Sequence, residues 1–105
     1  HLKDENFSSA MDDFTEALDI NPRSTSALNY RAFISYRMGN FDDAIQDYNK
    51  SLDLDPENAM GYYNRGMAHL RSGNKPKACA DFHASCSRGN MNACKMIKAE
   101  CGGGK

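Results

Sequence analysis

The sequence predicts an all-α fold, an antiparallel helix-pair solenoid of about six helices. Three observations predict it. The chain overlays on itself when it is shifted by 34 residues, small and apolar residues within each copy recur at helical spacing, and glycine or proline stands where each helix would end. Self-similarity at a period of about 20–50 residues is typical of stacked repeats, in which each unit buries its apolar face against the next.

The 34-residue period is clearest at small, acidic and aromatic positions. The coinciding sets are Ala10, Ala44 and Ala78; Asp13, Asp47 and Asp81; and Phe14, Tyr48 and Phe82. Within the middle copy, Ala44, Tyr48 and Leu52 recur at i, i+4 and i+8, which places them on one stripe of a helix. Gly39 is suited to end the helix before this stripe. Pro56 requires the helix that carries the stripe to end before Asp55.

These signals predict the boundaries of helices and units. We expect helices over 7–20, 25–38, 41–54, 59–72, 76–87 and 92–101. We expect residues 1–6 to be disordered or a tag remnant, 7–24 to be the second helix of a truncated first repeat, 25–58 and 59–92 to be full repeats, 93–101 to be a capping helix, and 102–105 to be a flexible tail.

The truncated first unit would lack its own first helix. Phe7, Ala10, Phe14 and Ala17 should therefore form an exposed apolar stripe on the helix over 7–20. Such a stripe predicts further repeats upstream in a longer protein, or self-association of this chain.

Composition excludes several classes. A length of 105 residues fits one small domain, and 40% hydrophobic residues is too many for a disordered chain. No apolar run approaches the length of a membrane span, so we expect no membrane insertion. The formal net charge of −1 divides into −7 over residues 1–58 and +6 over residues 59–105, which allows opposite ends of two copies to associate. Nothing resembles a nucleic-acid-binding motif.

Four cysteines lie in the last quarter of the chain, at spacings of 7, 8 and 7 residues. If the helices on either side of the turn at 88–90 form an antiparallel hairpin, Cys86 faces Cys94 and Cys79 faces Cys101. The cysteines could then form two disulfides or remain four buried thiols. A metal or redox module would draw on Cys79, His83, Cys86, Cys94 and Cys101. One zinc ion is disfavoured because the two pairs would lie about 10 Å apart along the helices.

Two stretches of the sequence, GNFDDAIQDYNKSLDLDP and LDLDPENAMGYYNRG, carry a family resemblance. They resemble the consensus of the tetratricopeptide repeat (TPR) family, and the resemblance extends over about residues 7–92. It implies a right-handed superhelix in which the first helices of the units line a concave groove. In that family the groove commonly holds a peptide or a helix of another protein. Ser35 and His69 depart from the pattern, because the family usually has a large apolar residue there.

Some members of the family bind chaperone C-terminal carboxylates with a clamp of Lys, Asn and Arg side chains. Asn64 matches the central Asn of that clamp. Asn29 and Phe33 stand where a Lys and an Asn would be needed, and Cys94 replaces a later Lys. This activity is therefore not expected here.

The segment ACADFHASCSRGNMNACKMI resembles exported bacterial repeat proteins that staple each helical hairpin with cysteines eight residues apart. This second resemblance favours disulfides and an oxidising compartment, periplasmic or exported. Four reduced cysteines would instead place the chain in the cytoplasm.

The sequence contains no nucleophile–base constellation and no phosphate-binding loop, so we expect neither catalysis nor a cofactor. What remains is a surface on the first helices that the core does not use. Its candidate partner-binding residues are Asn29, Tyr30, Phe33, Tyr36, Arg37, Met60, Tyr63, Asn64, Met67, Leu70 and Arg71. Protein interfaces are rich in aromatic residues, Met and Arg. We therefore expect a non-catalytic scaffold that binds a peptide or helix of another protein. The alternatives are self-assembly, and a metal or redox module built on the cysteines.

Overall fold

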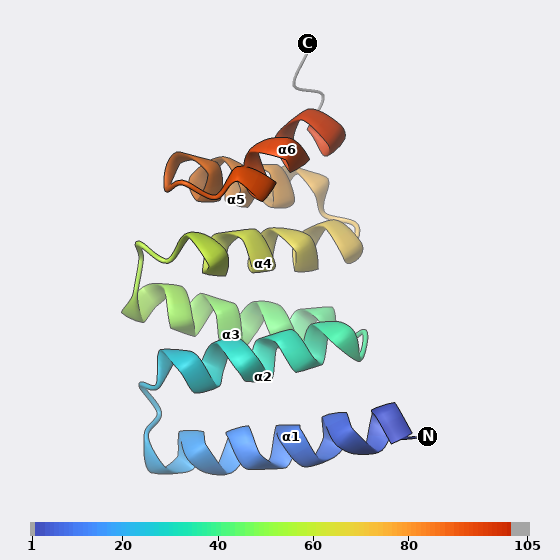
Figure 1. Cartoon of the computed structure of the whole chain (residues 1–105), viewed down its shortest axis with the longest axis vertical. Helices are drawn as coiled ribbons and strands as arrows, with labels where there is room; N and C mark the ends of the chain where they lie inside the picture. The colour runs from blue at the N-terminus through green and yellow to red at the C-terminus, as the bar shows by residue number, and fades with distance from the viewer. Residues whose placement is uncertain (1, 102–105) are drawn as a thin grey trace.

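The chain folds into a stack of antiparallel α-helices. The computed structural model describes the backbone of residues 2–101 and the side chains of residues 9–101. In this part of the chain the elements are α1 (Leu2–Ile20), α2 (Thr25–Arg37), α3 (Phe41–Leu54), α4 (Ala59–Arg71), α5 (Lys75–Ser87) and α6 (Met91–Glu100). Figure 1 shows them following one another in chain order from α1 at the bottom to α6 at the top. The predicted all-α class and its antiparallel helix pairs are confirmed.

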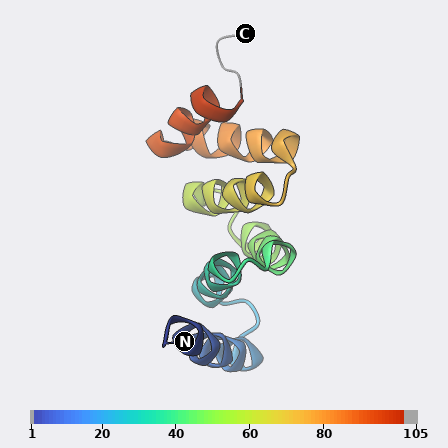
Figure 2. The ribbon, with the colours of Figure 1, turned by 90° about the vertical axis from the view of Figure 1, so that its right-hand side faces the viewer.

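Neighbouring helices in the sequence are neighbours in space. Each helix packs against the next, and α2 also contacts α4. The side view in Figure 2 shows the stack from its narrow edge, with α3 set to one side of α2. The molecule measures 45 × 31 × 19 Å along its principal axes, an elongated shape that leaves most helices exposed on one side.

The same chemistry ends three of the helices. Gly39, Gly73 and Gly89 follow α2, α4 and α5, and each has a positive φ, at 86°, 95° and 101°. This is the left-handed region that glycine enters without a steric cost. An asparagine follows each of these glycines, and the side chains of Asn74 and Asn90 accept backbone N–H groups of the helix that begins there. The Gly-Asn pairs therefore make the tight turns of the stack.

The observed helix bounds agree with the predicted ones to within one residue, except at the start of the chain. There α1 begins at Leu2 rather than at residue 7, so the expectation that residues 2–6 are disordered is wrong. The segment from Leu2 to Asn6 contains no Gly or Pro, and Leu, Lys and Glu favour the helix. The expectations for His1 and for the tail at 102–105 lie outside the described residues.

Small residues at the helix crossings let large aromatic rings fill the core. Ala32, Ala44 and Ala68 surround Tyr48 in one buried cluster, and the repeat-related Phe82 is buried in the next. A Cβ atom added at Gly66 would lie 2.8 Å from Cε1 of Phe82. The packing of α4 on α5 therefore depends on the absence of a side chain at this position.

The apolar stripe expected on α1 is largely covered. Phe14 and Ala17 are half-buried and pack against the cluster of Leu18, Ala27 and Leu28. The ring of Phe14 stacks on the ring of Tyr30, with centroids 5.4 Å apart. The expectation that these side chains face away from the structure is wrong, because α1 turns them toward α2. Ala10 is half-buried, and the side chain of Phe7 lies outside the described residues.

Several of the side chains that α1 exposes are acidic. Its exposed side chains include Asp12, Asp13, Glu16 and Asp19, together with Ile20, which is 81% exposed. None of the described helices has the length and apolar character needed to cross a membrane.

Candidate functional site

Two of the arginines are committed to the fold. Arg31 on α2 donates to both carboxylate oxygens of Asp47 on α3, at 2.7 and 2.9 Å. Arg65 on α4 binds Asp81 on α5 in the same way, at 2.9 and 2.7 Å. Hydrogen bonding to these carboxylates raises the pKa of both arginines. Because each guanidinium already holds a buried carboxylate, neither is free to bind a ligand.

Two other arginines lie beside a hollow at the turn end of α2 and α4. Tyr36, Arg37, Gly39, Phe41 and Arg71 line a hollow of about 430 Å³. We call Tyr36, Arg37, Phe41 and Arg71 the arginine notch. The turn at Gly39 brings Phe41, the first residue of α3, next to the last turn of α2. Arg71 comes from the corresponding position of α4, 34 residues after Arg37.

Stacked aromatic rings form one wall of the notch. The ring centroids of Tyr36 and Phe41 lie 5.6 Å apart, and those of Phe33 and Tyr36 lie 6.5 Å apart. The Cζ atom of Arg37 stands 5.8 Å from the centroid of Phe33, within the range of a cation–π contact. The guanidinium of Arg37 is therefore placed by an aromatic face rather than by a carboxylate.

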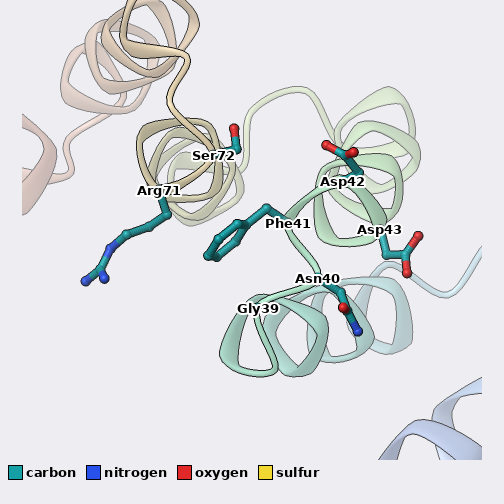
Figure 3. Close-up of a pocket in the computed structure, with 7 residues that line it drawn as sticks. All are labelled: Gly39, Asn40, Phe41, Asp42, Asp43, Arg71 and Ser72. Carbon is teal, nitrogen blue, oxygen red and sulfur yellow. The ribbon is translucent and has the colours of Figure 1, made fainter.

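The charges around the notch are separated. Arg37 and Arg71 are exposed, and neither forms an ion pair within the described part of the chain. Asp42 and Asp43 line an adjoining hollow of about 570 Å³ together with Arg71. Figure 3 shows the ring of Phe41 directed toward Arg71, with the two aspartates on its other side. The notch thus presents positive charge on one side of Phe41 and negative charge on the other.

The predicted residues of α2 reach the surface to different degrees. Tyr30 is 59% exposed and Phe33 is 43% exposed, although both take part in aromatic stacking. Tyr36 is half-buried in the notch. Asn29 is half-buried, and its Oδ1 atom has no hydrogen-bond partner among the described residues. Most of the exposed apolar area on this helix therefore belongs to aromatic rings.

The predicted residues of α4 divide differently. Tyr63, Met67 and Leu70 are half-buried and pack against the core cluster of Ala78, Phe82 and Ala93. Their predicted contact with a partner on the groove face stays a prediction, because part of each side chain is exposed. The apolar side chains of α6 pack on the same cluster. The ring centroid of Tyr63 lies 6.0 Å from that of Phe82. These side chains therefore stabilise the end of the stack.

Met60 and Asn64 do not join the notch. Met60 is 53% exposed and lies at the other end of α4, where it lines a separate hollow of about 350 Å³ with Arg88 and Met91. Asn64 is half-buried between the two ends of α4. Of the predicted set, the notch brings together Tyr36, Arg37 and Arg71, next to Phe33.

Phe41 was missed as a site residue. It follows the Gly-Asn turn in the second copy, where the third copy has Lys75, so periodicity marked it as variable between copies. Two signals could have identified it: an aromatic residue at the first position of a helix, and a turn that points back toward the preceding helix.

The cysteines form both of the considered disulfides. Cys86 bonds to Cys94 and Cys79 bonds to Cys101, with Cα atoms 4.9 and 5.8 Å apart. The helices α5 and α6 lie close enough along their length for the outer pair as well as the inner one. The thiols are therefore neither core filler nor metal ligands in this structure. Among the described residues, no group of three or more His, Cys, Asp or Glu side chains could hold a metal ion.

His69 on α4 has a displaced pKa. It occupies the position of Ser35 in the preceding copy, and its Nε2 atom lies 3.9 Å from Oδ2 of Asp81. Burial lowers the pKa of His69, and Arg65 and Lys77 lower it further, against the opposing effect of Asp81.

Comparison with known proteins gives the same architecture. A family model described as TPR repeat matches residues 34–73. No curated protein matches the sequence. The first TPR of Spaghetti (RPAP3), solved bound to the HSP90 peptide SRMEEVD, superposes with a TM-score of 0.87 at 21% identity, covering 97% of this chain and 82% of that one.

Two further solved structures are similar. The Arabidopsis OM64 TPR domain has a TM-score of 0.85 at 26% identity, over 93% of this chain and 83% of its own. MamA has a TM-score of 0.78 at 22% identity, over 88% of this chain. This chain spans 54% of the MamA chain. At this level of identity the likeness to these structures concerns the fold.

Proposed function

Because this chain is a TPR repeat domain, we propose that it is a non-catalytic protein-interaction module that binds a peptide or helix of a partner protein through α2 and α4. Domains of this kind typically act in protein–protein interaction, and the Spaghetti domain is itself bound to a peptide. One observation supports the proposal above the others. The structure leaves aromatic rings and two unpaired arginines exposed on one continuous stretch, from Tyr30 to the arginine notch.

The composition of this stretch suits binding. Large exposed apolar side chains lose contact with water when a partner covers them, at about 25 cal/mol per Å² of buried apolar area. Aromatic and arginine side chains dominate the energetics of interfaces because they bury a large area with few rotatable bonds. Tyr30, Phe33 and Tyr36 are also held in place by ring stacking before any partner arrives. Little conformational entropy is then lost on binding.

The experiment selects ligands without assuming their identity. A random peptide library displayed on phage is enriched on the purified chain, and the selected peptides are synthesised and titrated by calorimetry. We expect Tyr30→Ala and Phe33→Ala each to weaken binding about tenfold, as is usual for aromatic anchors. Tyr63→Ala is unsuitable, because that ring packs against Phe82 and its loss would disturb the core.

Ile20→Ala provides the matched control. Ile20 is the most exposed large apolar residue described, and it lies at the end of α1, away from the proposed surface. Its variant should bind like the wild type, and circular dichroism should show equal helicity in all variants. Peptides that bind the α2 variants at full strength, or that depend on Ile20, would contradict the proposal.

A second candidate function is head-to-tail self-assembly. The described exposed side chains of α1 include Asp12, Asp13, Glu16 and Asp19, whereas α6 exposes Lys95 and Lys98. Figure 1 places these helices at opposite ends of the stack. A heterologous contact of this kind does not close on itself and would grow into chains of molecules. Light scattering over a range of concentration should then show growth at low salt and its loss at high salt. A monomer throughout would remove this candidate.

A further inference from the structure

We propose that the arginine notch binds the carboxylate side chains of an acidic segment in the partner. This inference rests on the proposed function and specifies the ligand chemistry at one end of the same surface. It names a short internal stretch of Asp or Glu residues as the occupant, with one carboxylate for Arg37 and another for Arg71.

The first argument comes from a census of the arginines. The chain has six, and Arg31, Arg65 and Arg88 each bind a carboxylate within the described residues. The unpaired ones there are Arg23, Arg37 and Arg71. Arg23 lies in the connection between α1 and α2, whereas Arg37 and Arg71 line the same hollow. Three arginines are thus paired with carboxylates of this chain, whereas the two arginines of the notch have no such partner among the described residues.

The second argument is the lining of the notch. Its hollow of about 430 Å³ is lined by Tyr36, Arg37, Gly39, Phe41 and Arg71, a set with two arginines and no acidic residue. Two positive charges that face one space repel each other, and an anion between them relieves that repulsion. A planar guanidinium also matches a carboxylate with two parallel hydrogen bonds.

The third argument concerns the shape of the ligand. Arg37 and Arg71 belong to helices of successive repeats, so they offer two separate binding points along the stack. A segment with two acidic side chains can meet both, whereas a single terminal carboxylate meets one. The rings of Tyr36 and Phe41 between them would pack against the methylene groups of the same side chains.

The fourth argument is the limit set by Asp42 and Asp43. These exposed aspartates stand on the other side of Phe41 and would repel an acidic segment that continued past it. The acidic stretch should therefore be short and be followed by neutral or basic residues. The notch uses neither Asn64 nor the other positions of the carboxylate clamp, so this recognition is distinct from that of the clamp-bearing relatives.

Fluorescence anisotropy with labelled synthetic peptides tests the inference on the whole chain. The probe is a decapeptide of three glutamates followed by seven glutamines, with an amidated C-terminus, and its neutral counterpart is an amidated glutamine decapeptide. We expect Arg37→Gln and Arg71→Gln each to weaken binding of the glutamate peptide about fivefold, the upper range for an exposed charge pair. High salt should weaken it further in the wild type.

Two control variants separate the notch from general attraction to positive charge. Arg23→Gln and Lys98→Gln remove the same charge from exposed sites elsewhere, and both should bind the glutamate peptide like the wild type. Amide chemical shifts in a ¹⁵N-labelled sample should move at residues 36–41 and 71 on titration. Equal losses in all four variants, or shifts spread over α6, would overturn the proposal.

The remaining binding measurements distinguish the acidic segment from other ligands. If the glutamine decapeptide with a free C-terminus binds as tightly as the amidated glutamate peptide, a terminal carboxylate is the ligand and the inference is wrong. It is equally wrong if a phosphoserine peptide binds at the notch and the glutamate peptide does not. Dimerisation without added peptide that disappears in Arg71→Gln would place a second copy there instead.

The failure of this inference can be told apart from the failure of the proposed function. Selected peptides that need Tyr30 and Phe33, but are insensitive to Arg37→Gln and Arg71→Gln, would leave the interaction surface in place and remove the acidic ligand. If neither the selected peptides nor the glutamate peptide binds the α2–α4 surface, both fail.

Discussion

Arg65 and Asp81 are joined by two parallel hydrogen bonds between α4 and α5, and Arg31 and Asp47 repeat the arrangement 34 residues earlier. The free nitrogen of Arg65 also donates to Oδ1 of Asn49 on α3, at 2.8 Å. One side chain therefore joins three consecutive helices. The repeat unit is defined by this polar network as much as by its apolar stripe.

Asp81→Ala should strongly destabilise the fold. The substitution leaves the guanidinium of Arg65 without its charged partner in a largely buried site, which costs about 2–4 kcal/mol of unfolding free energy. Urea denaturation followed by circular dichroism measures this directly. The matched control is Asp42→Ala, because Asp42 is exposed and loses only its favourable interaction with the dipole at the start of α3, at most about 1 kcal/mol. Similar losses in the two variants would show that the network contributes little.

Stability should fall in mild acid because of His69. Its pKa in the folded chain is lowered from 6.5, so the unfolded chain binds the proton more readily. Above pH 6.5 the imidazole is neutral in both states and has no effect. As the pH falls below 6.5, the unfolded state is favoured until the folded pKa is passed. His69→Ser, which installs the residue found in the preceding copy, should flatten this dependence.

An unchanged dependence in His69→Ser would mean that other groups cause the loss of stability in acid.

Gly66→Ala should lower the free energy of unfolding by more than Gly61→Ala does. A Cβ at Gly66 meets the ring of Phe82 at 2.8 Å and the backbone oxygen of Ala78 at 3.2 Å, neither of which moves easily. A Cβ at Gly61 meets the flexible end of Leu52 at 2.9 Å. We expect a loss of about 1–3 kcal/mol at Gly66, as for overpacked cores. Thermal unfolding of the two variants side by side tests the order, and the reverse order would contradict this packing.

The two disulfides should differ in their contribution to the free energy of unfolding. Cys79 and Cys101 close a separation of 22 residues, and Cys86 and Cys94 one of 8. Loop entropy then predicts that replacing the outer pair by Ser costs about 3 kcal/mol and replacing the inner pair about 2 kcal/mol. Chemical denaturation of each double variant measures the costs. Equal costs, or a larger cost for the inner pair, would contradict the entropic account.

Intact mass after alkylation tests whether the bonds form in the isolated chain. Under denaturing, non-reducing conditions we expect no alkylated thiol, and four after reduction. Four alkylated thiols without reduction would remove the argument for an oxidising compartment.

The sequence predicts the fold well because the same pattern of residues recurs in each repeat unit. Ala44 and Ala78 mark the helix crossings, and Gly39 and Gly73 mark the turns. Each signal is local in the chain and is checked against another copy. Such periodic signals place helices to within a residue, as they did for α3.

The candidate site was less predictable, because it depends on contacts between neighbouring helices that differ from one unit to the next. Tyr63 and Phe33 belong to related stripes of α4 and α2, yet only Tyr63 packs against the core cluster on which α6 also packs. Phe14 matches the buried Tyr48 and Phe82 in sequence but is only half-buried, because the contacts of α1 within the described residues are mainly with α2. Periodicity gives the position of a residue within a unit but not the neighbours of that unit.

Because of the two disulfides, the local stability of the stack differs along its length. Helices α5 and α6 are joined covalently at two points, whereas α1 is held to α2 by side-chain packing. In a linear array of repeats, each unit is stabilised by its own contacts and by those with its neighbours. Among the described helices, the covalently joined pair α5 and α6 should therefore open less readily than α1 does. The surface on α2 and α4 lies between these two regions of different local stability.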